Sequence, residues 1–359
     1  MELYVTGKQA FIKACSLIDE AKYTIEIQMF IWRDDKIGNV ILEHVYQALK
    51  RGVKVAIKKD RYGSIFEKAE ENKQSLFHKR KDPSLMPLIR GIDFMYADKR
   101  KPKGYKQNDN LLLMEVLKHP NLSLTDKILK DHTKYYLVDD QKLLIGGVNI
   151  EDKENGKDIQ GRKYKDYMVY LNDKDFVKHF KARLNGLTYR GDKTLDILTN
   201  ASVKEAQEWI PYYLFRAKTE VIMHMAYFGA KKATKAIFKA LDNGVKVSIV
   251  TSSVSNLQTH YNLKLMKAFY KKGATIYLYE GLVHAKAIQI DDCLIVGSTN
   301  LNNSAFYTLG ECSLITNNKG LIEAFRLSHE RLIKESKIIL DSRNIRYNKC
   351  LAFLEKLVS

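Results

Sequence analysis

Two copies of one short motif contain the residues of this sequence whose types and spacing could do chemistry. Each copy reads His-x-Lys-x4-Asp, with His132, Lys134 and Asp139 in the first and His284, Lys286 and Asp291 in the second. Residues two apart on a β-strand point to the same face, so each copy would present an imidazole beside an ammonium group. Lysines can neutralise the oxygens of a phosphate ester, while a neutral imidazole attacks phosphorus and a protonated one donates to the leaving oxygen. We therefore expect these six residues to form a catalytic site for phosphoryl transfer.

A glycine-containing segment follows each motif and leads the chain back toward the histidines. The aspartate at the end of each motif predicts a hairpin turn, with returning strands at 143–145 and 294–296. Four residues after these strands can bind phosphate through a small side chain, a hydroxyl or an amide, namely Gly147, Asn149, Ser298 and Asn300. The second copy is one residue shorter between its aspartate and its glycine, which predicts a tighter hairpin.

Together these residues resemble the signature of the phospholipase D superfamily, in which His-x-Lys-x4-Asp and a later Gly-Ser/Gly-x-Asn occur twice. The resemblance covers essentially the whole chain. Gly147 stands where many members have serine, so we expect a hydroxyl contact only from Ser298. The resemblance implies that one histidine becomes a phosphohistidine, while the other acts as an acid and then as a base.

The same resemblance implies an acidic residue that orients each imidazole through its second ring nitrogen. Asp166 is the candidate for His132, and Glu311, which should lie on a neighbouring strand, is the candidate for His284. We assign His132 as the nucleophile and His284 as the acid, although the similarity of the two halves also allows the reverse.

The elements that must position these motifs repeat in the two halves. A strand, a helix and a Gly-Val-Lys-Val strand occur within 21–57 and again within 217–250, which is the pattern of a βαβ unit. We therefore expect an α/β fold with two pseudo-symmetric phospholipase D-like domains, 1–190 and 191–359. Each should contain a mixed, mostly parallel sheet flanked by helices, and the active site should lie at the domain interface.

The two halves differ in length before the motif. A predicted strand at 91–96 corresponds to one at 273–279, which places an insertion at 97–127 of the first half. The insertion is basic at its start and contains a predicted helix at 110–118. It is either a lid or substrate-binding element, or a solvated loop, and the sequence favours neither.

The composition is that of a globular protein with a strong positive charge. The 359 residues are 45% hydrophobic and carry a net charge of +18, which favours an anionic lipid surface or nucleic acid as partner. Lysine outnumbers arginine, as an AT-rich genome would also produce, so the charge is only supporting evidence. The four cysteines lack the spacing of metal ligands and predict buried, reduced thiols. We expect no cofactor, no metal, no signal peptide and no transmembrane helix.

Within the superfamily, the sequence is most similar to the bacterial cardiolipin synthase-like group, which shares the segments at 27–30, 51–55 and 60–64. The resemblance implies phosphatidyl transfer between phosphatidylglycerols, or phospholipid hydrolysis, by a monomer. We expect it in the cytoplasm, bound peripherally to the inner face of the membrane. One alternative is a nuclease or phosphodiesterase acting on DNA or RNA. A second is a catalytically inactive binding protein of the same fold.

Overall fold

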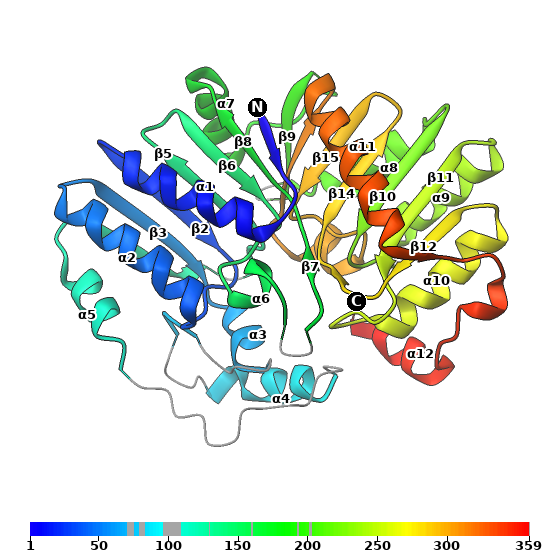
Figure 1. Ribbon diagram of the computed structural model, residues 1–359, viewed down its shortest axis with the longest axis horizontal. Helices are drawn as coiled ribbons and strands as arrows, with labels where there is room; N and C mark the ends of the chain where they lie inside the picture. Colours follow the sequence, from blue (N-terminus) through cyan, green and yellow to red (C-terminus); the bar gives the residue numbers. More distant parts are fainter. Residues whose placement is uncertain are drawn as a thin grey trace.

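The protein consists of two β-sheets and the helices that cover them (Figure 1). The computed structural model describes residues 1–69, 75–78, 83–95, 109–128, 130–158, 161–191, 194–200 and 203–358. The strands of the first half are β1 (Glu2–Tyr4), β2 (Thr24–Met29), β3 (Lys54–Asp60), β4 (Leu122–Ile128), β5 (Tyr135–Val138), β6 (Lys142–Gly146), β7 (Tyr164–Lys165) and β8 (Met168–Asn172). Those of the second half are β9 (Leu195–Thr199), β10 (Glu220–Met225), β11 (Lys246–Ser252), β12 (Thr275–Tyr279), β13 (Leu282–Val283), β14 (Lys286–Ile290), β15 (Cys293–Gly297), β16 (Cys312–Thr316) and β17 (Ser336–Ile338).

The two sheets have the same plan. The first has the order β1-β8-β6-β5-β2-β3-β4, and the second has the order β17-β12-β11-β10-β14-β15-β16-β9. Within these two sheets, parallel pairing is confined to β2-β3-β4 and β10-β11-β12, and the other described pairs are antiparallel. A separate two-stranded sheet pairs β7 with β13 in parallel. The predicted α/β fold with a mixed sheet in each half is confirmed. The mostly parallel character applies only to these three-strand blocks, because each motif hairpin reverses the strand direction.

Helices pack against the sheets or against other helices. They are α1 (Gly7–Glu20), α2 (Lys36–Lys50), α3 (Gly63–Ala69), α4 (Met86–Met95), α5 (Leu111–Lys118), α6 (Asp152–Asn155), α7 (Lys174–Leu184), α8 (Ala206–Phe215), α9 (Lys231–Asp242), α10 (Thr259–Lys271), α11 (Lys319–Lys334) and α12 (Lys349–Val358), with short turns η1 (Pro83–Leu85), η2 (Ser304–Thr308) and η3 (Ser342–Asn344). The apolar sides of α1, α2 and α5 pack on the first sheet, and those of α8, α9 and α10 pack on the second. Among the described helices, none combines the length and apolar character needed to cross a bilayer.

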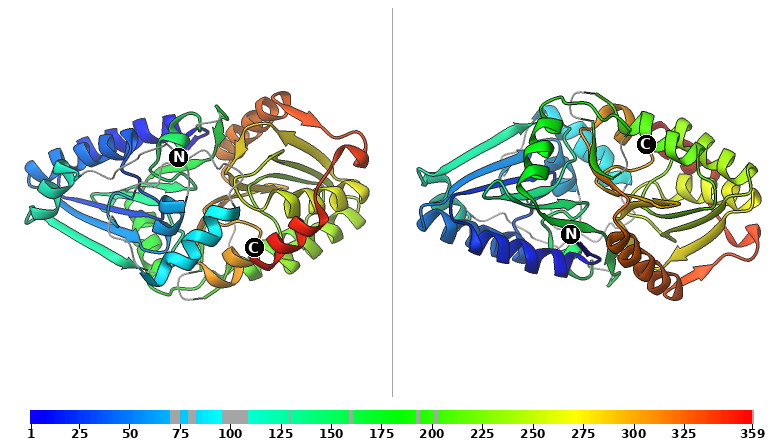
Figure 2. Two further views of the ribbon diagram at one scale, coloured as in Figure 1. Left: turned by 90° about the horizontal axis from the view of Figure 1, so that it is seen from below. Right: turned by 90° about the horizontal axis from the view of Figure 1, so that it is seen from above.

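The inner faces of the two sheets share one hydrophobic core. Leu137 and Ile145 of the first sheet belong to the same buried cluster as Ile222 and Leu294 of the second. The views along the vertical axis show the two halves packed side by side (Figure 2). The proposed boundary at 190/191 lies between β8 and β9, the last strand of one sheet and an edge strand of the other.

Local sequence explains the βαβ units. Asp35 caps α2 by accepting a hydrogen bond from the Gly38 amide at 2.9 Å. After α2 and α9 the chain turns at Gly52 and Gly244, where φ is +90° and +80°. Glycine adopts this left-handed conformation without the clash of a side chain, so the Val-Lys-Val strands can start at once.

Three expectations need correction. The segment at 91–96 is not a strand, because its described part lies in α4, and the counterpart of β12 is β4. The extra length of the first half therefore precedes this strand, between β3 and β4, and includes the predicted helix, which is present as α5. The basic start of the supposed insertion, at 97–108, lies outside the described residues. All four cysteines are free, but only Cys293 and Cys312 are buried, whereas Cys15 is partly buried and Cys350 is exposed.

Candidate active site

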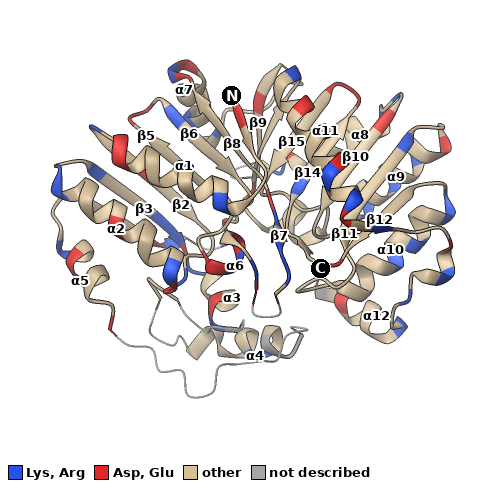
Figure 3. Cartoon of the chain, viewed as in Figure 1, with Lys and Arg blue, Asp and Glu red and all other residues tan. Residues whose placement is uncertain are grey.

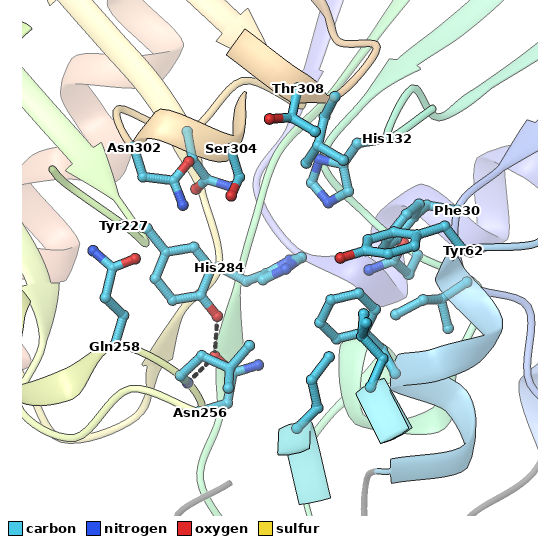
Figure 4. Close-up of a pocket in the computed structure, with 18 of the residues that line it drawn as sticks. Phe30, Tyr62, His132, Tyr227, Asn256, Gln258, His284, Asn302, Ser304 and Thr308 are labelled. Carbon is cyan, nitrogen blue, oxygen red and sulfur yellow. Dashed lines mark hydrogen bonds between the residues drawn. The ribbon is translucent and has the colours of Figure 1, made fainter. Parts of the chain in front are cut away.

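A cavity of about 600 Å³ lies between the two domains and is lined by both motif histidines (Figure 4). His132 and His284 stand immediately before the motif strands of their own domains and point into the cavity from different sides. The predicted position of the site at the domain interface therefore agrees with the structure.

Short strand pairings across the interface fix both histidines. β13, which precedes His284, pairs in parallel with β7, which precedes Asp166. The equivalent bridge joins Asp131 to Gly310, so that the His132 amide donates to the Gly310 carbonyl oxygen at 2.7 Å. Each histidine is thereby held beside an acidic residue of the opposite domain.

This crossing corrects the predicted acid–histidine pairs. His132 Nδ1 lies 3.1 Å from Glu311 Oε2, and His284 Nδ1 lies 2.9 Å from Asp166 Oδ2. Asp166 and Glu311 therefore do contact the imidazoles, but each serves the histidine of the other domain. Engagement of Nδ1 leaves Nε2 of each ring as the nitrogen available to a substrate.

His132 lies in surroundings that favour its neutral form. Burial lowers its pKa well below the usual range, and the ammonium groups of Lys134 and Lys286 lower this pKa further. Burial also raises the pKa of Glu311 to about 8, even though Lys134 and a hydrogen bond from Ser298 oppose this shift. The edge of the His132 ring meets the ring of Phe30, with 4.7 Å between centroids. A neutral imidazole is the form that can attack phosphorus.

His284 has the opposite tendency because two carboxylates surround it. Burial and the Lys286 ammonium lower its pKa, but Glu154 and Asp166 outweigh them, so the pKa is raised above its usual value. Glu154 Oε1 also lies 2.9 Å from Nδ1, although only the Asp166 contact has hydrogen-bond geometry. The protonated form of His284 is therefore favoured, as a general acid requires.

The two motif lysines are buried beside the histidines. Each donates a hydrogen bond to the carbonyl oxygen of the histidine two residues earlier. Burial and repulsion from Lys286 lower the pKa of Lys134 to about 7. A bound phosphate would favour the charged form of both lysines, since its negative charge replaces the water that burial removes.

The residues predicted to bind phosphate occupy different places. Asn149 and Asn300 line the cavity, and the Oδ1 atom of each is buried without a hydrogen-bond partner among the described residues. Buried polar atoms are normally satisfied, so a bound substrate or water would be expected to supply the missing partner. Ser298 instead donates to Glu311 and helps to hold that carboxylate. A Cβ at Gly147 would lie 2.3 Å from Asp166 Oδ1, so glycine leaves room for the acid.

The aspartates of the two motifs are structural, and their expected catalytic role is corrected. Asp139 accepts hydrogen bonds from the amides of Lys22, Tyr23 and Thr24 at 2.8 to 2.9 Å. Asp291 makes the equivalent contacts with 218–220. Each aspartate lies at the far end of its motif strand. At the residue spacing of a β-strand, it is roughly 20 Å from the histidine of the same motif. They tie the motif hairpins to β2 and β10.

Sequence reasoning missed Glu154, which α6 places beside His284. Its only signal was its position shortly after Asn149 in a segment similar to the cardiolipin synthase-like group. In the described part of the chain, Glu154, Asp166 and His284 are also the one group of three or more residues with metal-ligand atoms within 4.8 Å of one another. Lys286 Nζ lies 3.7 Å from Asp166 Oδ2, so a cation already balances this group.

Comparisons with known proteins identify related sequences and structures. The family described as "Cardiolipin synthase, PLD-like domain" matches residues 14–188 and 212–333. The major cardiolipin synthase ClsA of Bacillus subtilis is 22% identical over 85% of this chain and 63% of its own length. Cardiolipin synthase A of Pseudomonas syringae is 23% identical over 88% of this chain and 64% of its own length. The chain thus spans slightly less than two thirds of these relatives.

The fold also occurs in solved structures. The phosphatidylserine synthase of Haemophilus influenzae superposes with a TM-score of 0.70 at 14% identity, covering 99% of this chain and 94% of that protein. The polyphosphate kinase of Porphyromonas gingivalis gives a TM-score of 0.58 at 12% identity and covers 52% of that chain. At these identities the likeness concerns the fold alone.

Proposed function

Because the chain belongs to the cardiolipin synthase, PLD-like domain family, we propose that it transfers a phosphatidyl group through a phosphohistidine intermediate. One observation supports this most: two imidazoles with opposite protonation tendencies, His132 and His284, face one cavity. Such a pair provides a neutral imidazole as nucleophile and a protonated imidazole as general acid in the same site.

In the first step, neutral His132 attacks phosphorus through Nε2. A P–N bond forms as the P–O bond to the leaving alcohol breaks, and His284 gives its Nε2 proton to that alcohol. Lys134, Lys286, Asn149 and Asn300 stabilise the charge on the phosphoryl oxygens. In the second step, neutral His284 takes a proton from the incoming hydroxyl group, whose oxygen attacks phosphorus and releases His132.

A lipid substrate fits the cavity better than a nucleic acid. Phe30, Phe66 and Ile92 are among the apolar residues that line its first-domain side, as a lipid would require. Basic and acidic residues are interspersed over the described helices visible in Figure 3, whereas binding to nucleic acid typically uses basic residues clustered on one face. We therefore propose phosphatidylglycerol as both donor and acceptor, as the names of the curated relatives suggest, with water as a competing acceptor.

We further propose peripheral binding to an anionic membrane through α12, at the inner face of the membrane. This helix exposes four large apolar side chains and two lysines, namely Leu351, Phe353, Leu354, Leu357, Lys349 and Lys356. Its Glu355 lines the catalytic cavity, so a bilayer held against α12 would lie close to the site. Because both motifs belong to one chain, we propose a monomer as the active unit.

The proposal is tested by incubating the protein with phosphatidylglycerol vesicles, and separately with single- and double-stranded DNA, and analysing products by mass spectrometry. We expect cardiolipin and free glycerol, with a loss of at least about a thousandfold for His132→Ala and for His284→Ala. His44→Ala, which changes a surface histidine, is the matched control. Phosphatidic acid alone would indicate hydrolysis, and cut DNA with untouched lipid would refute the lipid assignment.

Trapping the intermediate tests the mechanism separately. Acid-labile label from a substrate with radioactive phosphorus should remain on the protein after rapid denaturation, and peptide mapping should locate it on His132. Label on His284 would reverse the assigned roles. If the wild type converts substrate but no label remains on the protein, a covalent intermediate that lasts long enough to trap is excluded.

A further inference from the structure

The catalytic cavity has two sides of different chemical character (Figure 4). Phe30 and Tyr62 represent the first-domain side, which is mainly apolar and aromatic around them. Tyr227, Asn256 and Asn302 represent the second-domain side, where hydroxyl and amide groups gather beside His284. The two parts of a phospholipid, its acyl region and its headgroup, differ in the same way.

The polar side contains hydrogen-bonding groups that internal contacts leave available. Asn302 is 8% exposed, and its Oδ1 accepts from the Ala305 amide at 3.1 Å, whereas its Nδ2 has no partner among the described residues. Within the same set, the Ser304 hydroxyl also makes no hydrogen bond, although it lines the cavity. Both residues line the cavity, so the NH2 group of Asn302 and the Ser304 hydroxyl are available to a ligand that binds there.

Internal contacts also hold this side in place. The Tyr227 hydroxyl donates to Asn256 Oδ1, as the dashed line in Figure 4 shows. Gln258 has a φ of +59°, which is uncommon for a residue other than glycine, and its amide donates to the Phe228 carbonyl oxygen. Strained backbone of this kind tends to occur at ligand sites, because the surrounding contacts must maintain it.

The charge of the polar side limits the ligand. Apart from His284, Glu355 is the one ionisable acid or base that the described second-domain residues contribute to the cavity lining. A carboxylate-bearing headgroup would require a cation there, and an ammonium group would require an acid among the amides, whereas Glu355 already accepts a hydrogen bond from the Tyr261 amide at 2.7 Å. Neutral hydroxyls match amide and hydroxyl groups without burying a charge.

We propose that Tyr227, Asn256, Asn302 and Ser304 form an acceptor subsite that selects a neutral polyol headgroup. The inference rests on the proposed phosphatidyl transfer and assigns a place to its second substrate. One hydroxyl of the polyol loses its proton to His284 as its oxygen bonds to phosphorus, and the P–N bond to His132 breaks. The remaining hydroxyls bind the polar side, while the diacylglycerol part of the intermediate contacts the apolar side.

A donor with a different leaving group separates this subsite from the first step. Vesicles containing the p-nitrophenyl ester of phosphatidic acid report formation of the intermediate by p-nitrophenol release. Added glycerol then competes with water, and mass spectrometry gives the ratio of phosphatidylglycerol to phosphatidic acid. Asn302→Asp keeps the oxygen that accepts from Ala305 but removes the NH2 donor, and Tyr227→Phe removes one hydroxyl.

We expect each substitution to lower the ratio of transfer to hydrolysis by about tenfold, the effect of losing one good hydrogen bond, without abolishing p-nitrophenol release. Asn302→Asp should also raise the preference for ethanolamine over glycerol, because the new carboxylate attracts an ammonium group. Tyr307→Phe, which removes an exposed hydroxyl outside the cavity lining, is the matched control. An unchanged ratio in both variants would overturn the acceptor subsite. Absence of p-nitrophenol release from the wild type would instead overturn the proposed function.

Discussion

Single carboxylates distinguish the surroundings of the two motif histidines. His132 has one acidic neighbour, Glu311, whereas His284 lies between Asp166 and Glu154. The same motif therefore occurs in two electrostatic environments. The difference supports the proposed roles of His132 and His284, which the symmetric sequence motifs leave open.

Activity should depend on pH with two limbs. Because the pKa of His132 is lowered, this imidazole loses its proton below pH 6.5. The neutral form is the one that attacks phosphorus, so activity should rise with pH in the acidic range. The raised pKa of His284 keeps its proton above pH 6.5, so activity should fall again at higher pH. A profile of kcat/KM against pH checks this, and a rise that continued through the basic range would contradict the acid role of His284.

Glu154→Gln should move only the basic limb. The substitution removes a negative charge beside His284, which lowers the pKa of that imidazole and shifts the limb to lower pH. The acidic limb, which reports His132, should stay in place. Glu355→Gln is the control, because that carboxylate lines the same cavity but is bonded to the Tyr261 amide. An equal loss of activity at every pH would instead indicate that Glu154 has only a structural role.

The types and spacing of the motif residues predicted the histidines and lysines, and the family resemblance predicted the two orienting acids. It paired the acids with the wrong histidines, since nearness along the chain was the available guide and the pairing is set by strands that cross the domain interface. Glu154 was not predicted, because a glutamate in a polar helix is ordinary until the fold brings it to His284.

At the scale of elements, each motif hairpin is tied to the strand beside it. The shorter spacing of the second motif predicted a tighter turn, and the register agrees. Val138 pairs with Lys142 in the first hairpin, whereas Ile290 pairs with Cys293 in the second. The strand at 122–128 was not predicted because it lies at the edge of the sheet, where its side chains alternate between partly buried and exposed. Its pattern in the sequence is weaker than that of the aromatic segment at 91–96.

Asp291→Asn should destabilise the second domain. Asparagine tolerates the φ of +50° at this turn, but its NH2 group faces backbone amides that donate to the carboxylate. We expect a loss of about 1–3 kcal/mol in the free energy of unfolding. Asp292→Asn, at the next residue of the turn, should change it by less than about 0.5 kcal/mol. If both variants lost the same free energy of unfolding in urea, the contacts of Asp291 with the backbone amides would not explain the loss.

The same contacts predict a pH effect on stability. Burial raises the pKa of Asp291, but hydrogen bonds from Thr219 and neighbouring amides outweigh it, so the folded-state pKa is lowered. The stabilising contribution is therefore complete above the unfolded value of about 3.9 and is lost as the pH falls through the folded value. Wild type and Asp291→Asn should consequently converge in stability at low pH.

Gly147→Ala should impair catalysis. The added Cβ would lie 2.3 Å from Asp166 Oδ1, so the acid must move away from His284. We expect kcat to fall by about a hundredfold or more, as occurs when groups at a reacting centre are misplaced by an ångström. Gly156→Ala is the control, because nothing lies within 4 Å of its added Cβ. An active Gly147→Ala protein would show that Asp166 can adjust.

At the scale of the whole molecule, the exposed apolar residues of α12 should determine membrane binding. Replacing Leu351, Leu354 and Leu357 by serine should reduce co-sedimentation with anionic vesicles, while hydrolysis of a short-chain, water-soluble substrate should persist. Leu327→Ser, on the exposed side of α11, is the control. Vesicle binding that survives the triple substitution would place the membrane contact elsewhere.

The crossed acid–histidine pairs also matter while the chain is being made. His132 depends on Glu311, a residue 179 positions later in the chain. A ribosome-bound chain that has completed only its first domain therefore presents the proposed nucleophile without its orienting acid. Such a chain should be inert toward phospholipid until most of the second domain has emerged and docked, so that lipid chemistry begins only with the finished enzyme.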